Sequence, residues 1–204
     1  MLKKLLLSSI FIIGALLSIA FVRTLMHSAP EPTVNVGLTA DIDGEAATNN
    51  LAASIRFKTI SHQDKEKFSP QEFEGFIKWA ADTYPEFHSA MQLEMLEYTL
   101  LFKWEGSDNS LAPILLTAHY DVVPVIPGTE SIWEEEPFAG VISNNRIWGR
   151  GALDDKSGVV GMMEAATYLI QNNFQPTRTV YFSFGHDEEI GGGGAAQVTE
   201  KLKQ

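Results

Sequence analysis

The stretch PILLTAHYD, residues 113–121, is a short apolar run that ends in a histidine and an aspartate. Residues 179–189, TVYFSFGHDEE, contain a second apolar run, followed by a histidine and three acidic residues. Short, continuous apolar runs are typical of strands that are buried on both faces of a sheet. We therefore predict two buried strands, at 113–118 and 179–184, with polar side chains after the carboxyl end of each.

The segments around these runs predict an α/β fold with a mixed sheet flanked by helices. Ser69-Pro70-Gln71-Glu72 has the residues of a helix start, and a helical face of apolar residues continues through 73–80. The Asn144-Asn145 pair predicts the turn of a hairpin. The other expected elements are helices at 45–60, at 158–170 and after 191–194, and strands at 98–104 and on either side of the turn within 141–148.

The charge and the cysteine content of the chain exclude several classes of function. The chain has 204 residues and a formal net charge of −11, which argues against binding to a nucleic-acid backbone. Solubility alone would also explain this acidity. The chain has no cysteine, which excludes disulfides, thiolate metal sites and a cysteine nucleophile.

The N-terminus has the pattern of a targeting segment. Lys3 and Lys4 precede a run of 18 uncharged residues, Leu5 to Val22, that Arg23 closes. Residues 1–27 are therefore a signal peptide or a signal-anchor helix, and the absence of a good small-residue cleavage site favours the anchor. The lysines would stay in the cytoplasm, so the remainder of the chain would be exported, either membrane-anchored or secreted. Residues 28–44 are expected to be a linker, and 45–204 a folded domain.

Three polar clusters lie at nearly equal intervals along the chain. They are His119-Tyr120-Asp121, Asp154-Asp155 and Asp187-Glu188-Glu189. Asp154 is 35 positions after His119, and Glu188 is 34 positions after Asp154. An imidazole with several carboxylates beside buried strands indicates a divalent metal. Each cluster also has a simpler explanation: a surface His–Asp pair for the first, and an Asp N-cap of the next helix for the second.

The third cluster is the hardest to explain by stability. Adjacent glutamates at a buried strand end repel each other unless a cation neutralises them. One glutamate can bind the metal while its neighbour takes a proton from water and later returns it to the leaving group.

Four stretches together resemble one known family. They are 117–124 (TAHYDVVP), 133–138 (WEEEPF), 149–156 (GRGALDDK) and 185–189 (GHDEE). From residue 115 to about 196 the chain is similar to the zinc-dependent aminoacylase/carboxypeptidase metallopeptidases. The GHDEE stretch and the N-terminal apolar segment look most like the branch of carboxypeptidase S and the N-fatty-acyl-amino-acid synthase/hydrolases.

The resemblance implies a role for each residue of the clusters. His119 would bind one zinc ion, Glu189 would bind a second, and Asp154 would bridge the two. Asp121 would orient His119, and Glu188 would be the general base. The resemblance also implies a cis peptide bond between Asp154 and the residue after it.

The family pattern includes two further metal ligands, a carboxylate and a late histidine, that have no counterpart before Gln204. We therefore expect residues 45–204 to be the N-terminal part of the catalytic domain of a di-zinc hydrolase, with this catalytic part extracytoplasmic. The enzyme would cleave an amide next to a free amino-acid carboxylate, in a peptide or an N-acyl amino acid. The alternative is a catalytically incompetent fragment that acts only as a metal-binding or interaction protein. The sequence does not indicate the substrate side chain or the oligomeric state.

Overall fold

A computed structural model of the chain describes residues 2–27 and 40–203, in two units, Met1–Ala40 and Asp41–Gln204, which are described separately. The first unit is helix α1 (Leu2–Leu25). Within it, Leu6–Leu25 has a mean hydropathy of 2.2 and is long and apolar enough to cross a membrane. Most of the expected linker, up to residue 39, lies outside the described residues. Near its end, the side chain of Asp43 caps the next helix by accepting hydrogen bonds from two backbone N–H groups.

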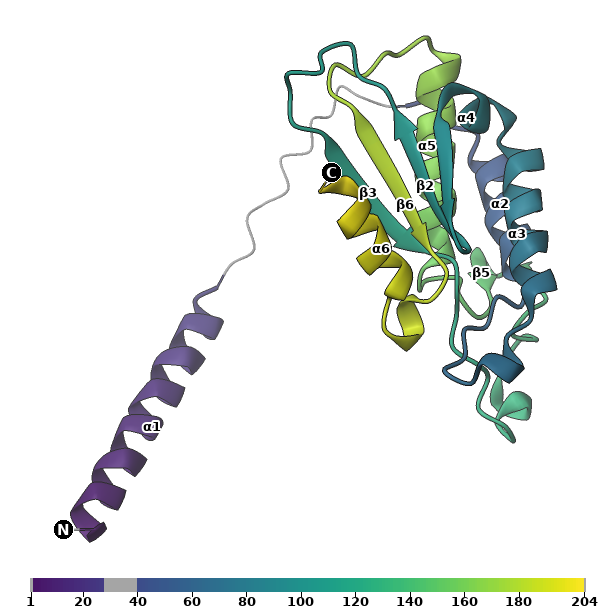
Figure 1. Cartoon of the computed structure of the whole chain (residues 1–204). Helices are drawn as coiled ribbons and strands as arrows, with labels where there is room; N and C mark the ends of the chain where they lie inside the picture. The colour runs from purple at the N-terminus through teal and green to yellow at the C-terminus, as the bar shows by residue number, and fades with distance from the viewer. Residues whose placement is uncertain (1, 28–39, 204) are drawn as a thin grey trace. The chain divides into compact units, whose positions relative to one another are not determined.

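The second unit contains a four-stranded mixed sheet in the order β1-β2-β6-β3, which confirms the predicted α/β class (Figure 1). Its strands are β1 (Gln92–Leu96), β2 (Thr99–Trp104), β3 (Ile114–His119) and β6 (Val180–Gly185). β3 runs parallel to β6, and the other neighbours are antiparallel. The parallel pairing brings the carboxyl ends of β3 and β6 together, with His119 opposite Gly185.

Helices cover both faces of the sheet (Figure 1). Helix α5 (Lys156–Gln171) lies on one face together with α2 (Gly44–Ile55), α3 (Pro70–Thr83) and α4 (Pro85–Ala90), and α6 (Gly193–Leu202) lies on the other. The core between the sheet and the first group is rich in aromatic side chains, each of which stabilises the fold by about 1.5–3 kcal/mol through burial. Its most buried aromatic members are Phe73, Phe76, Phe87, Phe102, Tyr120 and Phe184.

The remaining elements are short. The predicted hairpin is β4 (Val141–Ser143) paired with β5 (Arg146–Trp148), and its turn residues Asn144 and Asn145 have φ angles of 51° and 57°. Positive φ at both turn positions is what the tight hairpin turn requires, and asparagine tolerates it. Three 3₁₀ turns complete the unit: η1 (Lys65–Lys67), η2 (Glu130–Ile132) and η3 (Glu188–Ile190).

Two expectations are corrected, and two elements were missed. The helix expected at 45–60 ends at Ile55, because the residues after it leave the helix and Ile60 bridges Val122. The strand after Pro113 is not buried on both faces: Ile114 and Leu115 are 42% and 44% exposed, because β3 lies at an edge of the sheet. Helix α4 and strand β1 were not predicted at all.

Candidate metal centre

His119 is the last residue of β3, and its ring is nearly buried. The strand pairing places it beside the end of β6, and the 3₁₀ turn that carries Glu188 and Glu189 follows directly. Gly185 lies close to His119, since a Cβ at this position would be in ordinary van der Waals contact with the Cβ of His119, at 3.5 Å. Two strand ends therefore deliver an imidazole and two carboxylates to the same place.

Asp154 reaches the same place from the loop before α5. The peptide bond between Asp154 and Asp155 is cis, as the resemblance implied. Asp155 is the N-cap of α5 and accepts a hydrogen bond from the Gly158 N–H at 3.2 Å. Oδ1 of Asp154 instead lies 3.0 Å from Nε2 of His119. Asp155 thus caps the helix, and its neighbour Asp154 is the residue that could contact a metal.

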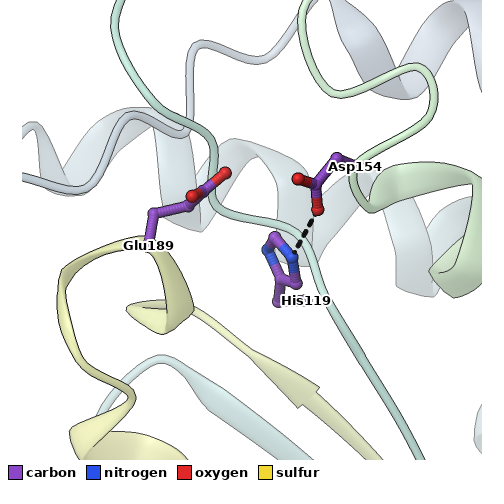
Figure 2. Close-up of side chains that lie close together, drawn as sticks. All are labelled: His119, Asp154 and Glu189. Carbon is purple, nitrogen blue, oxygen red and sulfur yellow. Dashed lines mark hydrogen bonds and ion pairs between the residues drawn. The ribbon is translucent and has the colours of Figure 1, made fainter. Parts of the chain in front are cut away.

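His119, Asp154 and Glu189 form a compact cluster. Each offers one nitrogen or oxygen atom, and these three atoms lie within 4.8 Å of one another. Figure 2 shows the three side chains directed toward a common space from separate segments of the chain. A zinc ion takes imidazole nitrogen and carboxylate oxygen at about 2.0–2.2 Å, so ligands around one ion lie up to roughly 4 Å apart. The donor types fit zinc, and separations of this size suit either one ion or two neighbouring ions that share a ligand.

Asp121 lies behind the cluster and is fully buried. Its carboxylate accepts hydrogen bonds from Ser61 Oγ at 2.6 Å and from the N–H groups of Glu188 and Glu189, each at 3.1 Å. Its Oδ1 lies 3.2 Å from Nδ1 of His119. Burial alone would raise the pKa of Asp121, but the hydrogen bonds from His119 and Ser61 and from the two N–H groups lower it below its ordinary value. Asp121 is therefore a carboxylate that joins three segments.

The electrostatics of the cluster favour a positive charge. Burial lowers the pKa of His119, but the carboxylate of Asp121 outweighs it and raises the pKa to about 9. Burial and the nearby charge of Asp154 raise the pKa of Glu189. Neighbouring carboxylates contribute to both shifts, and a proton or a metal ion can neutralise their negative charge.

Glu188 has more freedom than the other carboxylates. Its side chain is 60% exposed, and its Oε2 lies 3.8 Å from Nε2 of His119. It lies next to the cluster without belonging to the closest set of three atoms. This position suits a residue that moves protons rather than one that only holds an ion.

The structure thus brings together all five residues that the sequence indicated, and it adds others. Ser61 touches Asp121 from a segment that carried no motif. His186 and Asp187, which received no metal role, hold the framework: Nδ1 of His186 lies 2.7 Å from Thr99 Oγ1, and Asp187 accepts a hydrogen bond from the Gly194 N–H at the start of α6.

Comparison with known proteins is consistent with this geometry. Residues 115–204 match the family described as Peptidase family M20/M25/M40. The chain is 36% identical over 194 residues to Probable carboxypeptidase S-like 2 of Dictyostelium discoideum, over 91% of this chain and 37% of that protein. It is 38% identical over 157 residues to N-fatty-acyl-amino acid synthase/hydrolase PM20D1 of Xenopus tropicalis, over 75% of this chain and 30% of that protein.

A solved structure supports the fold. Human carnosine dipeptidase 1 superposes with a TM-score of 0.64 at 21% identity, over 78% of this chain and 35% of that chain. The present chain spans about a third of the length of the curated relatives that it matches. From the matched residues and these relatives, we conclude that the chain belongs to peptidase family M20/M25/M40.

Proposed function

We propose that this cluster is part of the active site of a zinc-dependent hydrolase that cleaves an amide bond next to a free amino-acid carboxylate. The substrate would be a peptide C-terminus or an N-acyl amino acid, in line with relatives named carboxypeptidase and N-fatty-acyl-amino acid synthase/hydrolase. The observation that carries the proposal is the convergence of His119, Asp154 and Glu189, with Asp121 behind the histidine.

In the proposed site His119 would hold one zinc ion, Glu189 a second, and Asp154 both. Zinc polarises a carbonyl group and lowers the pKa of a bound water. Asp121 keeps the hydrogen of His119 on Nδ1, so Nε2 is free to donate its lone pair. Glu188 would take a proton from the attacking water and deliver it to the leaving nitrogen. Its exposure and its place beside His119 suit both steps.

We further propose that α1 is a membrane anchor. Its apolar stretch Leu6–Leu25 is preceded by Lys3 and Lys4, and the helix contains no acidic residue. By the positive-inside rule, the two lysines would lie in the cytoplasm and the hydrolase unit on the opposite side of the membrane.

Metal analysis and activity assays of the purified full chain in detergent test the proposal. We expect bound zinc, and release of amino acid from N-acyl amino acids or dipeptides. Glu188→Gln should keep its zinc and lose about 100-fold or more of its turnover, the usual contribution of a general base. Glu74→Gln, on the exposed side of α3, is the matched control and should behave like the wild type.

A second candidate is a metal-binding protein without catalytic activity. The openness of the cluster favours it, because the side chain of Asp154 is 76% exposed and the described residues supply three close donors. Turnover that Glu188→Gln abolishes would exclude this candidate. Zinc binding without turnover by these 204 residues, together with turnover by a longer chain that includes the further sequence of the relatives, would place the activity in the whole protein.

A further inference from the structure

Lys156, at the start of α5, is fully buried. Its Nζ donates hydrogen bonds to the backbone carbonyl groups of Ser54 at 2.8 Å and Phe57 at 2.7 Å, and it lies 5.4 Å from the centroid of the Phe76 ring. A lysine is rarely buried without a carboxylate partner. Here the carbonyl groups at the end of α2 take that place.

The segment that receives Lys156 also holds the end of β3. Thr59 Oγ1 donates to the carbonyl group of Tyr120 at 2.6 Å, and the Val122 N–H donates to the carbonyl group of Thr59 at 2.9 Å. Two residues further on, Ser61 Oγ donates to the carboxylate of Asp121 at 2.6 Å. Segment 54–61 is therefore bonded on one side to the residues that carry and orient His119, and on the other to Lys156.

We propose that Lys156 is a positioning residue that fastens the Asp154 loop to segment 54–61 and thereby sets the separation between Asp154 and His119. This inference rests on the proposed metal site. Asp154 is two residues from Lys156, and its Oδ1 lies 3.0 Å from Nε2 of His119. The two donors come from different segments, so their spacing depends on what connects those segments.

The packing around the lysine stem limits how far the loop can move. The Lys156 N–H donates to the carbonyl group of Gly151 at 3.0 Å. Gly151 has a φ of +81°, and a Cβ at this position would lie 2.6 Å from Cγ1 of Val122 and 3.3 Å from Cδ of Lys156. The stem is thus enclosed between the loop and the strand end that it connects, which leaves little room for the loop to slide.

Lys156→Met tests the proposal because methionine fills the space of the stem without donating hydrogen bonds. Lys78→Met, which replaces an exposed lysine on α3, is the control. Two readouts are needed in the full chain. Amide hydrogen exchange of residues 149–158 in the metal-free protein reports the position of the loop, and titration with Co²⁺, followed by its visible spectrum, reports the assembled ligands.

We expect Lys156→Met to exchange amide hydrogens in 149–158 at least tenfold faster, and to bind Co²⁺ about 10- to 100-fold more weakly, the usual effect of losing a residue that supports a ligand. Exchange in β2 and β6 should stay as in the wild type. Unchanged loop exchange would overturn the inference. So would an equal loss of protection throughout the sheet, because Lys156 would then serve folding alone.

The outcomes separate this inference from the proposed function. A wild-type chain that binds no Co²⁺ would contradict the metal site, while loop exchange would still decide the role of Lys156. If Lys156→Met does not fold, Lys156→Gln replaces it, since its amide can still donate to one carbonyl group. That variant should give intermediate loop exchange and intermediate Co²⁺ affinity, and wild-type values for both would overturn the inference.

Discussion

Nδ1 of His119 lies 3.2 Å from the carboxylate and 3.1 Å from the backbone carbonyl oxygen of Asp121. Both oxygen atoms can only accept a hydrogen bond, so Nδ1 carries a hydrogen whichever of them it contacts. Nε2 is then the nitrogen that faces Asp154. One residue thus determines which nitrogen of the imidazole is directed toward the proposed metal.

Asp121→Asn should weaken metal binding by about 10- to 100-fold, because the amide cannot match the carboxylate in orienting His119. It should also destabilise the unmetallated fold by about 1–3 kcal/mol, because its NH₂ group would face donors that now have an acceptor. Zinc titration and urea unfolding measure the two effects. Asp64→Asn, at the exposed N-cap of η1, is a comparison variant and should leave zinc affinity unchanged. Wild-type zinc affinity in Asp121→Asn would show that this carboxylate does not support the ligand.

Zinc binding should tighten as the pH rises toward 9. Without metal, His119 keeps a proton up to a pKa of about 9, and the metal must displace that proton. The apparent affinity should rise by up to about tenfold per pH unit between pH 6.5 and 8.5. In the metal-free chain, protonation of His119 also stabilises the fold. This contribution is complete below about pH 6.5, and it is lost as the pH rises through 9. A zinc affinity that is constant over this range would contradict the assignment of His119 as a ligand.

Lys156 should make stability depend on pH in the opposite direction. Burial lowers its pKa to about 7 from an ordinary value of 10.5. Between these values the unfolded chain binds the extra proton, so the wild type should gain up to about 1.4 kcal/mol per pH unit relative to Lys156→Met. Urea unfolding of both chains at pH 7, 8 and 9 measures this difference. If the stability difference between the two chains does not change with pH, the Lys156 amine has the same pKa in the folded and the unfolded chain.

Two glycines test the packing of the 124–140 loop against α2. Gly140 has a φ of +60° and Gly128 a φ of +85°, so alanine is strained at either position, by about 1–2 kcal/mol. A Cβ at Gly140 would also collide with the backbone of Ala52, whereas nothing lies within 4 Å of one at Gly128. Thermal unfolding should show Gly140→Ala to be less stable than Gly128→Ala by about 1–3 kcal/mol. Equal losses would show that the loop moves aside.

The parts of the fold that the sequence predicted are those with a local signal. Continuous apolar runs located β2, β3 and β6, and Pro70 marked the first residue of α3. Strand β1 was missed because it is only five residues long and has no continuous apolar run, and its apolar residues Leu93 and Met95 are 41% and 48% exposed. Its turn uses Glu97 at a φ of 56°, where glycine or asparagine would have been the usual signal.

In the candidate site, too, some residues had a signal in the sequence and others had none. Its imidazole and carboxylates follow strand ends and turns, so their residue types and spacing were visible in the sequence. The groups that hold them in place were not. Ser61 reaches Asp121 across 60 residues, and Lys156 reaches the carbonyl group of Ser54 across 102. A backbone carbonyl group has no residue type, so no sequence pattern identifies it as the partner of a distant lysine.

His119 ends the strand that borders the sheet. β6 occupies one side of β3, and no other described strand pairs with its outer side. A further strand aligned parallel to β3 would finish beside His119, and its next residue would come within reach of the proposed metal site. A strand that pairs with the outer side of β3 would therefore both extend the sheet and supply a further metal ligand.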